Sequence, residues 1–279
     1  MNSLYRELAP ISAAAWAEIE MEAKRTLKAG LAARKLVDFK GPLGLAVSAV
    51  DTGRRQSVAP LAGTKIDAQL RESQPLVEIR VPFEIERAEL DALDRGAKDA
   101  DLDPVIDAAQ RIARAEDRAV FHGYAAALIK GICESAPDGP LPLTDNYEDY
   151  PLAVARALTR LRAAGVDGPY AIALGSHCYT GLTETTKGGY PVIEHVRQML
   201  DGPIIFAPAV DGAAVLSTRG DDFELTVGQD ISIGYLDHDR EMVRLYLQER
   251  FTFRVLTPRA AVPLAYAKKG EERGKKGRG

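Results

Sequence analysis

Residues 41–70, GPLGLAVSAVDTGRRQSVAPLAGTKIDAQL, constrain the fold most, because they predict two strands that have nothing of their own to pack on. Two short strand-like runs lie on either side of Asp51-Thr52-Gly53, which reads as a turn. The segment contains no aromatic residue, and an isolated two-stranded hairpin is marginally stable in water. We therefore expect this hairpin to lie on another surface, and a neighbouring copy of the chain is one candidate.

Two amphipathic helices are predicted. Ser12 is a plausible N-cap for a helix over residues 12–31, whose apolar positions recur at steps of three and four. Asp103 as N-cap and Pro104 in the first helical position begin the longest predicted helix, which extends to about Cys133. Its apolar face is formed by Val105, Ala109, Ile112, Ala113, Val120, Tyr124, Ala127 and Leu128. We expect this second helix to be a spine against which other elements pack.

The remaining segments predict a mixture of helices and strands. A half-buried strand at residues 75–85 precedes a helical segment at 86–101, and the proline-rich residues 135–143 mark a boundary between two lobes. A helix at 151–164, a strand at 170–174 and a helix that begins at Pro191 follow. Six further strands are predicted at residues 213–218, 223–227, 230–236, 243–249, 251–257 and 261–266. The pattern is typical of an α+β fold.

Composition favours a globular protein with no membrane segment. The chain has 279 residues, 46% of them hydrophobic, and no long uncharged apolar run. Its N-terminus carries Arg6 and Glu7 and lacks the apolar region of a signal peptide, so we expect a cytoplasmic protein. Cys133 and Cys178 are accordingly expected to be reduced.

Charge is distributed unevenly along the chain. The formal net charge is −4, but residues 268–279 contain six basic and two acidic residues, which leaves −8 for residues 1–267. This tail is too polar to offset its ordering entropy by burial, so we expect a solvated extension. Binding to nucleic acid or to an anionic surface is the alternative for the tail.

The cluster of acids at residues 219–239 raises the question of a metal site. Its six carboxylates belong to Asp221, Asp222, Glu224, Asp230, Asp237 and Asp239. A calcium loop needs oxygen ligands at alternate positions, whereas Phe223, Leu225 and Val227 have the spacing of a strand. We therefore expect no metal site, and we expect the acids to flank strands.

Other catalytic patterns are weak. His177 and Cys178 are adjacent, so neither a helix nor a strand directs both side chains to one point. No nucleophile elbow, phosphate-binding loop or metalloprotease motif occurs. His195 and His238 neighbour acids in the manner of surface pairs. The sequence thus predicts no catalytic residue and no cofactor, and it favours assembly over catalysis.

Several long strings resemble encapsulin, the bacterial nanocompartment shell protein of the linocin or bacteriocin family. They are LYRELAPISAAAWAEIEMEAKRTL, ARKLVDFKGPLG, AEDRAVFHG, GVDGPYAIALGS, GGYPVIEHV and RGDDFELTVGQDISIGY with VRLYLQERFTFRV. The resemblance covers about residues 3–266 in collinear order. It implies the Hong Kong 97 phage major capsid fold, and many copies of one chain that close into an icosahedral shell.

The resemblance also implies a division of the chain. Residues 1–40 would form an N-terminal helical arm, 41–75 an extended loop laid on a neighbour, 76–138 a peripheral domain with the spine helix, 139–228 an axial domain, 229–267 peripheral strands, and 268–279 a basic tail on the exterior. Closed symmetry would supply the surface that the hairpin lacks.

Family members enclose cargo enzymes, commonly ferritin-like proteins or dye-decolourising peroxidases, through a C-terminal peptide on the cargo. Carried over by match, the peptide-binding residues are Leu27, Leu31, Arg34, Val37, Asp38, Asp230, Ile231, Ile233 and Tyr235. Apolar side chains would form a groove, and Arg34 and Asp38 would fix the peptide's register. The alternative is that these residues only hold the helix on the sheet.

The resemblance further places a pore loop at the fivefold axis. Its residues are Glu184, Thr185, Thr186, Lys187, Gly188 and Gly189, and repeated copies of Glu184 and Lys187 would set a ring of charge. The alternative is a turn with solvated charges.

Two other functions stay open at this point. One is a prophage major capsid protein that packages DNA, and the other is a peptidase or bacteriocin. The acidic body argues mildly against nucleic acid as a partner, and no nucleophile supports a peptidase. The expected partners are other copies of the chain and a cargo enzyme, without a membrane.

Overall fold

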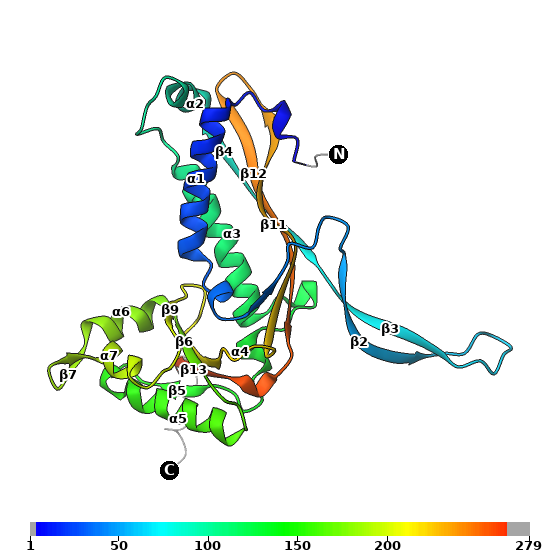
Figure 1. Cartoon of the computed structure of the whole chain (residues 1–279), viewed down its shortest axis with the longest axis vertical. Coiled ribbons are helices and arrows are strands. Elements are labelled where there is room, and N and C mark those ends of the chain that lie inside the picture. Colours follow the sequence, from blue (N-terminus) through cyan, green and yellow to red (C-terminus); the bar gives the residue numbers. More distant parts are fainter. Residues whose placement is uncertain (1–3, 267–279) are drawn as a thin grey trace, which may run out of the picture.

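The structure is a computed structural model in which residues 4–266 are described. Two separate sheets form the body, and a long two-stranded hairpin projects from it (Figure 1). The basic tail at residues 268–279 lies outside the described residues. Within residues 4–266, five short 3-10 helices join the larger elements: η1 (Arg6–Leu8), η2 (Ala33–Lys35), η3 (Ala125–Ala127), η4 (Tyr147–Asp149) and η5 (Pro258–Ala260).

The first sheet has four strands in the order β1 (Asp38–Lys40), β11 (Phe223–His238), β12 (Met242–Val255) and β4 (Val77–Glu86). The strands β11, β12 and β4 are antiparallel, and β1 runs parallel to the start of β11. The prediction of separate strands at 223–227 and 230–236, and at 243–249 and 251–257, is wrong, because each pair is one continuous strand. Gly228 and the polar residues after it mark irregular pairing between Val227 and Ser232, and they do not end the strand.

Helices α1 (Ala13–Gly30) and α3 (Asp103–His122) lie side by side on this sheet (Figure 1). Ile19, Ala23, Ile112, Ile233 and Leu245 are among the buried residues that join them to it. As predicted, Ser12 caps α1: its hydroxyl accepts a hydrogen bond from the amide of Ala15 at 3.1 Å. A shorter helix, α2 (Arg87–Asp94), connects β4 to the loop before α3.

The predicted extent of the spine helix is wrong at its C-terminal end. Asp103 is its first residue and not its cap, and the helix stops at His122, where Gly123 adopts a φ of 87°. A Cβ on Gly123 would lie 3.0 Å from the amide nitrogen of Gly131. The chain thus turns back on itself there and forms the separate helix α4 (Ile132–Ser135), which leaves Tyr124 and Leu128 exposed.

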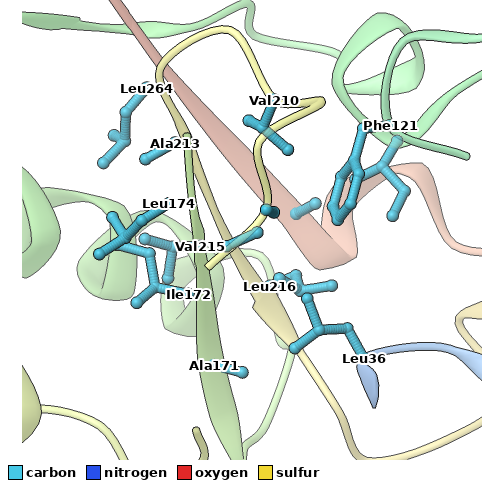
Figure 2. Close-up of a cluster of buried hydrophobic side chains, with 14 of the residues drawn as sticks. Leu36, Phe121, Ala171, Ile172, Leu174, Val210, Ala213, Val215, Leu216 and Leu264 are labelled. Atoms are coloured by element: carbon cyan, nitrogen blue, oxygen red, sulfur yellow. The ribbon is translucent and has the colours of Figure 1, made fainter. Parts of the chain in front are cut away.

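The second sheet has five strands in the order β5 (Leu141–Leu143), β13 (Ala261–Tyr266), β10 (Ala213–Ser217), β6 (Tyr170–Leu174) and β9 (Ile204–Phe206). Helices α5 (Tyr150–Ala163), α6 (Ser176–Glu184) and α7 (Val192–Arg197) pack around it. Figure 2 shows its core, where Leu216 of the sheet lies beside Leu36 and Val210 lies beside Phe121, so the N-terminal arm and α3 share this core. The predicted strand at 170–174 and helix at 151–164 are confirmed.

The sheets do not follow the predicted domain limits at the C-terminal side. The expected boundary at 228/229 falls inside β11, and β13 belongs to the five-stranded sheet although residues 229–267 were expected to be peripheral. The chain therefore passes between the two sheets more often than the predicted domain limits indicate. The other domain limits stay predictions.

The projecting hairpin consists of β2 (Ala49–Val58) and β3 (Ala68–Pro75). The predicted turn at Asp51-Thr52-Gly53 is wrong: these residues form an irregularity within β2, where Gly53 has a φ of 72°, and residues 59–67 connect the strands. A positive φ suits a glycine in a bulge as well as in a turn. Four large apolar side chains on the hairpin are exposed, those of Val58, Leu61, Ile66 and Leu70.

Candidate functional site

A groove of about 490 Å³ lies between α1 and β11. We call it the α1 groove, and it is lined by Leu4, Arg6, Glu20, Ala23, Lys24, Leu27, Lys28, Leu31, Arg34, Asp230, Ile231, Ser232, Ile233 and Leu247. The predicted residues Leu27, Leu31, Arg34, Asp230, Ile231 and Ile233 are all among them. Segments about 200 residues apart in the sequence thus meet at one surface.

The structure places the other three predicted residues elsewhere. Val37 and Asp38 line a neighbouring pocket of about 150 Å³ together with Ser217, Gly220 and Arg34, which also lines the α1 groove. The carboxylate of Asp38 accepts a hydrogen bond from the amide of Asp221 at 2.6 Å. The reason is the path of the chain, since β1 pairs with the start of β11 and leads away from the groove.

Tyr235 follows the groove residues on β11 without lining the groove itself. Its hydroxyl lies 2.5 Å from Nδ1 of His238. Gly234 beside it faces Tyr246, because a Cβ on Gly234 would lie 2.1 Å from Cζ of that ring. The glycine in the SIGY string is therefore required by close packing between β11 and β12.

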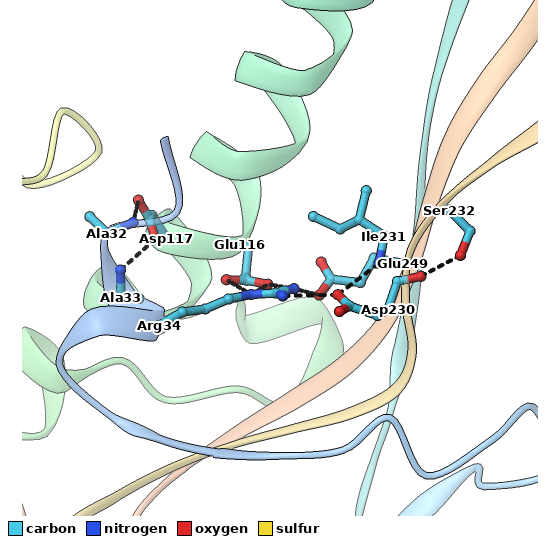
Figure 3. Close-up of polar contacts among 9 residues, drawn as sticks. All are labelled: Ala32, Ala33, Arg34, Glu116, Asp117, Asp230, Ile231, Ser232 and Glu249. Atoms are coloured by element: carbon cyan, nitrogen blue, oxygen red, sulfur yellow. Dashed lines mark hydrogen bonds and ion pairs between the residues drawn. The ribbon is translucent and has the colours of Figure 1, made fainter. Parts of the chain in front are cut away.

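Arg34 sits at one end of the groove and is held by three carboxylates of its own chain (Figure 3). Its Nε lies 2.9 Å from Oε2 of Glu116, one terminal nitrogen lies 2.6 Å from Oε1 of Glu249, and the other lies 2.8 Å from Oδ1 of Asp230. Arg34 and Asp38 both line the second pocket, so the expectation that they fix a peptide's register stays a prediction, although the donors of Arg34 are engaged within its own chain.

Burial controls the charges in this cluster. Glu116 and Glu249 are fully buried. Desolvation and the nearby Glu116 raise the pKa of Glu249 well above its ordinary value. Burial alone would lower the pKa of Arg34, but the hydrogen bonds and charges of its acidic partners outweigh it and raise that pKa.

Asp117 fastens the end of the arm to α3. Its two carboxylate oxygens accept hydrogen bonds from the backbone amides of Ala32 at 3.0 Å and Ala33 at 2.8 Å (Figure 3). Desolvation raises the pKa of Asp117 to about 7, although these two hydrogen bonds act in the opposite direction. The position of η2, and with it that of Arg34, thus depends on a buried titratable group.

The chemistry of the α1 groove suits an extended, partly apolar ligand. Leu27, Ile231 and Ile233 give it apolar surface, while Lys24 and Lys28 of α1 add positive charge. Sequence reasoning did not select these two lysines. The signal was present, because Lys24 and Lys28 lie three residues before Leu27 and Leu31 and so share their helix face.

The predicted loop at residues 184–189 is an exposed hairpin. Glu184 ends α6, and the strands β7 (Thr186–Lys187) and β8 (Tyr190–Pro191) are joined by Gly188 and Gly189, both at positive φ. The ammonium of Lys187 donates to the carbonyl of Glu148 at 2.9 Å, and Nε2 of His195 lies 3.1 Å from the carbonyl of Lys187. The ammonium of Lys187 is thus bonded to its own chain, and Lys187 is exposed, as are Glu184 and Thr186.

His177 and Cys178 bond to different tyrosines. The Tyr147 hydroxyl lies 2.9 Å from Nε2 of His177, and the Tyr150 hydroxyl donates to Sγ of Cys178 at 2.8 Å. Burial raises the pKa of the Cys178 thiol. Both cysteines of the chain are free, as expected.

The acids of residues 219–239 serve mainly as ion-pair partners. Asp222 pairs with Arg219, Glu224 with Lys40 and Arg254, Asp230 with Arg34, and Asp237 and Asp239 with Arg244. Within residues 4–266 the structure contains no group of three His, Cys, Asp or Glu side chains that could hold a metal ion. No helix in this part of the chain is long and apolar enough to cross a membrane.

Comparison with known proteins gives consistent matches over most of the chain. The Linocin_M18 family, described as "Encapsulating protein for peroxidase", matches residues 1–252. A type 1 encapsulin shell protein of Rhodospirillum rubrum is 58% identical over 270 residues, which is 95% of this chain and 96% of the relative. A virus-like particle from Pyrococcus furiosus has a TM-score of 0.61 at 17% identity, covering 89% of this chain and 98% of the other.

A phage capsid is also similar in structure. The capsid of Myoviridae phage XM1 has a TM-score of 0.53 at 10% identity, over 86% of this chain and 91% of that chain. At this level of identity the likeness concerns the fold. The predicted α+β phage capsid fold of the Hong Kong 97 type is confirmed.

Proposed function

This chain belongs to the Linocin_M18 family of encapsulating proteins and is a type 1 encapsulin shell protein, and we propose that its α1 groove holds a peptide of the protein that the shell encloses. Copies of the chain close into an icosahedral container. The chain itself provides the wall, and the redox or iron chemistry belongs to the enclosed protein. A peroxidase is the first candidate, since the family description names one.

One observation carries the groove assignment: apolar side chains of α1 and β11 remain accessible in a groove of about 490 Å³. If these residues only held the helix on the sheet, Ile231 would be expected to pack completely, yet it is half-buried. Lys24 and Lys28 give the same wall a positive charge that favours an acidic residue in the peptide. An extended peptide fits such a surface because alternate side chains enter the groove.

Ile231→Asp tests this proposal. Shells are first purified from the native host and the enclosed protein is identified, and its C-terminal peptide is then fused to a fluorescent protein that is co-expressed with the shell. The variant is expected to form shells that lose the fluorescent protein, because a carboxylate replaces apolar contact in the groove. Leu236→Asp is the matched control, since Leu236 is exposed on the same strand and lies outside the groove. Equal loading of Ile231→Asp and wild-type shells rejects the groove.

We also propose that the 184–189 loop lines a pore where several copies meet. Both of its charged residues are exposed, and the ammonium of Lys187 is tied to the carbonyl of Glu148, so Glu184 is the residue that would place a carboxylate ring at the pore. A ring of carboxylates favours cations over anions. Glu184→Gln should therefore slow the quenching of an enclosed fluorescent protein by Cu²⁺. Glu148→Gln should not slow it, because Glu148 bonds to Lys187 only through its backbone carbonyl, which the substitution keeps. Identical quenching rates would exclude Glu184 from the path.

A further inference from the structure

The N-terminal segment Leu4–Leu8 lies against the edge of β11 beside the α1 groove. The amide of Tyr235 donates to the carbonyl of Leu4 at 2.8 Å, which is a strand-like contact between the chain's N-terminus and β11. The guanidinium of Arg6 lies 4.1 Å from the ring centroid of Trp16 and forms an ion pair with Glu20. Leu4 and Arg6 both line the groove.

The edge of β11 that this segment touches is otherwise open. Among the described strands, β12 covers one side of β11, and β1 covers the other side only at Glu224–Thr226. Pairing with β12 is regular from Ser232 to Tyr235, and the Tyr235 amide points away from β12 because it reaches Leu4. Since alternate residues direct their backbone groups to the same side, Ile233 presents its amide and carbonyl to this open edge.

The segment is weakly held at that edge. Its helix η1 buries no residue, and both partners of the Arg6–Glu20 pair are partly exposed. Partly exposed ion pairs and exposed cation–π contacts contribute little to stability. The segment can therefore leave β11 without disturbing the core of α1 and the sheet.

Open strand edges bind extended peptides by adding them as a further strand. We propose that Leu4–Leu8 and the peptide of the enclosed protein compete for the open edge of β11 at Ile233–Tyr235. In the empty shell the chain's own N-terminus occupies the edge, and the incoming peptide displaces it while its apolar side chains enter the groove. This inference rests on the proposed function of the α1 groove.

Hydrogen–deuterium exchange of full-length shells tests the competition directly. The probe is a synthetic copy of the C-terminal peptide identified for the loading experiment. On binding, the backbone amides of residues 6–8 should exchange faster because the segment is displaced, while the Tyr235 amide should stay protected because the peptide replaces Leu4 as its acceptor. Unchanged or slower exchange at residues 6–8 would overturn the proposal, because the segment would then be a fixed wall of the groove.

Arg6→Ala gives a second, independent measurement. It removes the ion pair with Glu20 and the contact with Trp16, so the peptide should bind to the variant shells about 3- to 10-fold more tightly, the range that one weak contact provides. Arg25→Ala is the control, because Arg25 pairs with Glu22 within α1 and does not line the groove. Equal or weaker binding to Arg6→Ala would contradict competition.

Ile231→Asp separates this inference from the proposed function. If the peptide binds to wild-type shells, fails to bind to Ile231→Asp, and binds equally to Arg6→Ala, then the groove is the binding site and the competition is wrong. If Ile231→Asp binds the peptide as wild type does, the proposed function itself fails.

Discussion

The guanidinium of Arg34 joins three segments that are distant in the sequence, through Glu116 on α3, Asp230 on β11 and Glu249 on β12. Removing one partner of a buried charge cluster leaves the others without compensation, at a cost of about 3–5 kcal/mol. Arg34→Leu should lower the free energy of unfolding by this amount in urea denaturation followed by the fluorescence of Trp16, the single tryptophan.

Glu249→Gln provides the contrast. Burial raises the pKa of Glu249 well above its ordinary value, which favours the neutral carboxyl, and an amide resembles that form. The substitution should change the free energy of unfolding by less than about 1 kcal/mol. A loss as large as that of Arg34→Leu would show that Glu249 is ionised in the folded chain.

Asp117 predicts a dependence of stability on pH. Its pKa is raised from 3.8 to about 7 in the folded chain, so the folded state holds a proton that the unfolded state releases near pH 4. The stability contributed by this proton is complete below about pH 4 and is lost as the pH rises to about 7. Over this pH window, the thermal midpoint of wild type should therefore fall relative to that of Asp117→Asn as the pH rises. A difference that is constant from pH 4 to 8 would contradict the raised pKa.

The sequence alone could not show which acids pair with Arg34. Arg34 and Glu249 are separated by 215 residues, and an ion pair of this kind depends on how β12 lies against α3. Resemblance to a family gave the groove residues on α1 and β11, and the structure brings six of them together. Val37 and Asp38 line the neighbouring pocket, and their proximity to Arg34 in the sequence does not show that the chain leaves the groove after η2.

At the scale of elements, α1 is the helix that the sequence predicts most completely, because its signals are local. Ser12 accepts the hydrogen bond of the Ala15 amide, and its hydroxyl donates to the carboxylate of Asp94, the last residue of α2. Ser12→Ala should lower the free energy of unfolding by about 1 kcal/mol and speed amide exchange at residues 13–16. Ser57→Ala, on the exposed hairpin, is the control. Unaltered exchange at the start of α1 would show that the cap contributes nothing.

Longer elements were predicted less well, for a common reason. Gly228, Gly53 and Gly123 each interrupt a local pattern, but the first two mark irregularities within continuous strands and only the third ends a helix. A glycine does not itself show which of these the chain adopts, because pairing with β12 or β3 decides whether the strand continues. Local sequence patterns therefore predict which elements form, whereas tertiary contacts determine how long these elements are.

A single chain leaves apolar side chains of its hairpin uncovered. The β2–β3 hairpin extends away from the body (Figure 1), and its exposed apolar residues Val58, Leu61, Ile66 and Leu70 lack the burial that stabilises a hairpin. Leu61→Asp together with Ile66→Asp should leave the circular dichroism of the body unchanged while it prevents assembly, because both residues lie in the connection between the strands. Assembly of this double variant at wild-type yield would show that the hairpin's apolar tip is dispensable.

The central claim is that copies of this chain complete one another by closing into a hollow container. Analytical ultracentrifugation of the purified protein, with electron microscopy of the same sample, tests it most directly. The account predicts one large, uniform species that appears as closed shells, with the 30.2 kDa chain as a minor species. A folded monomer that persists at all protein concentrations, without shells on the grid, would contradict it.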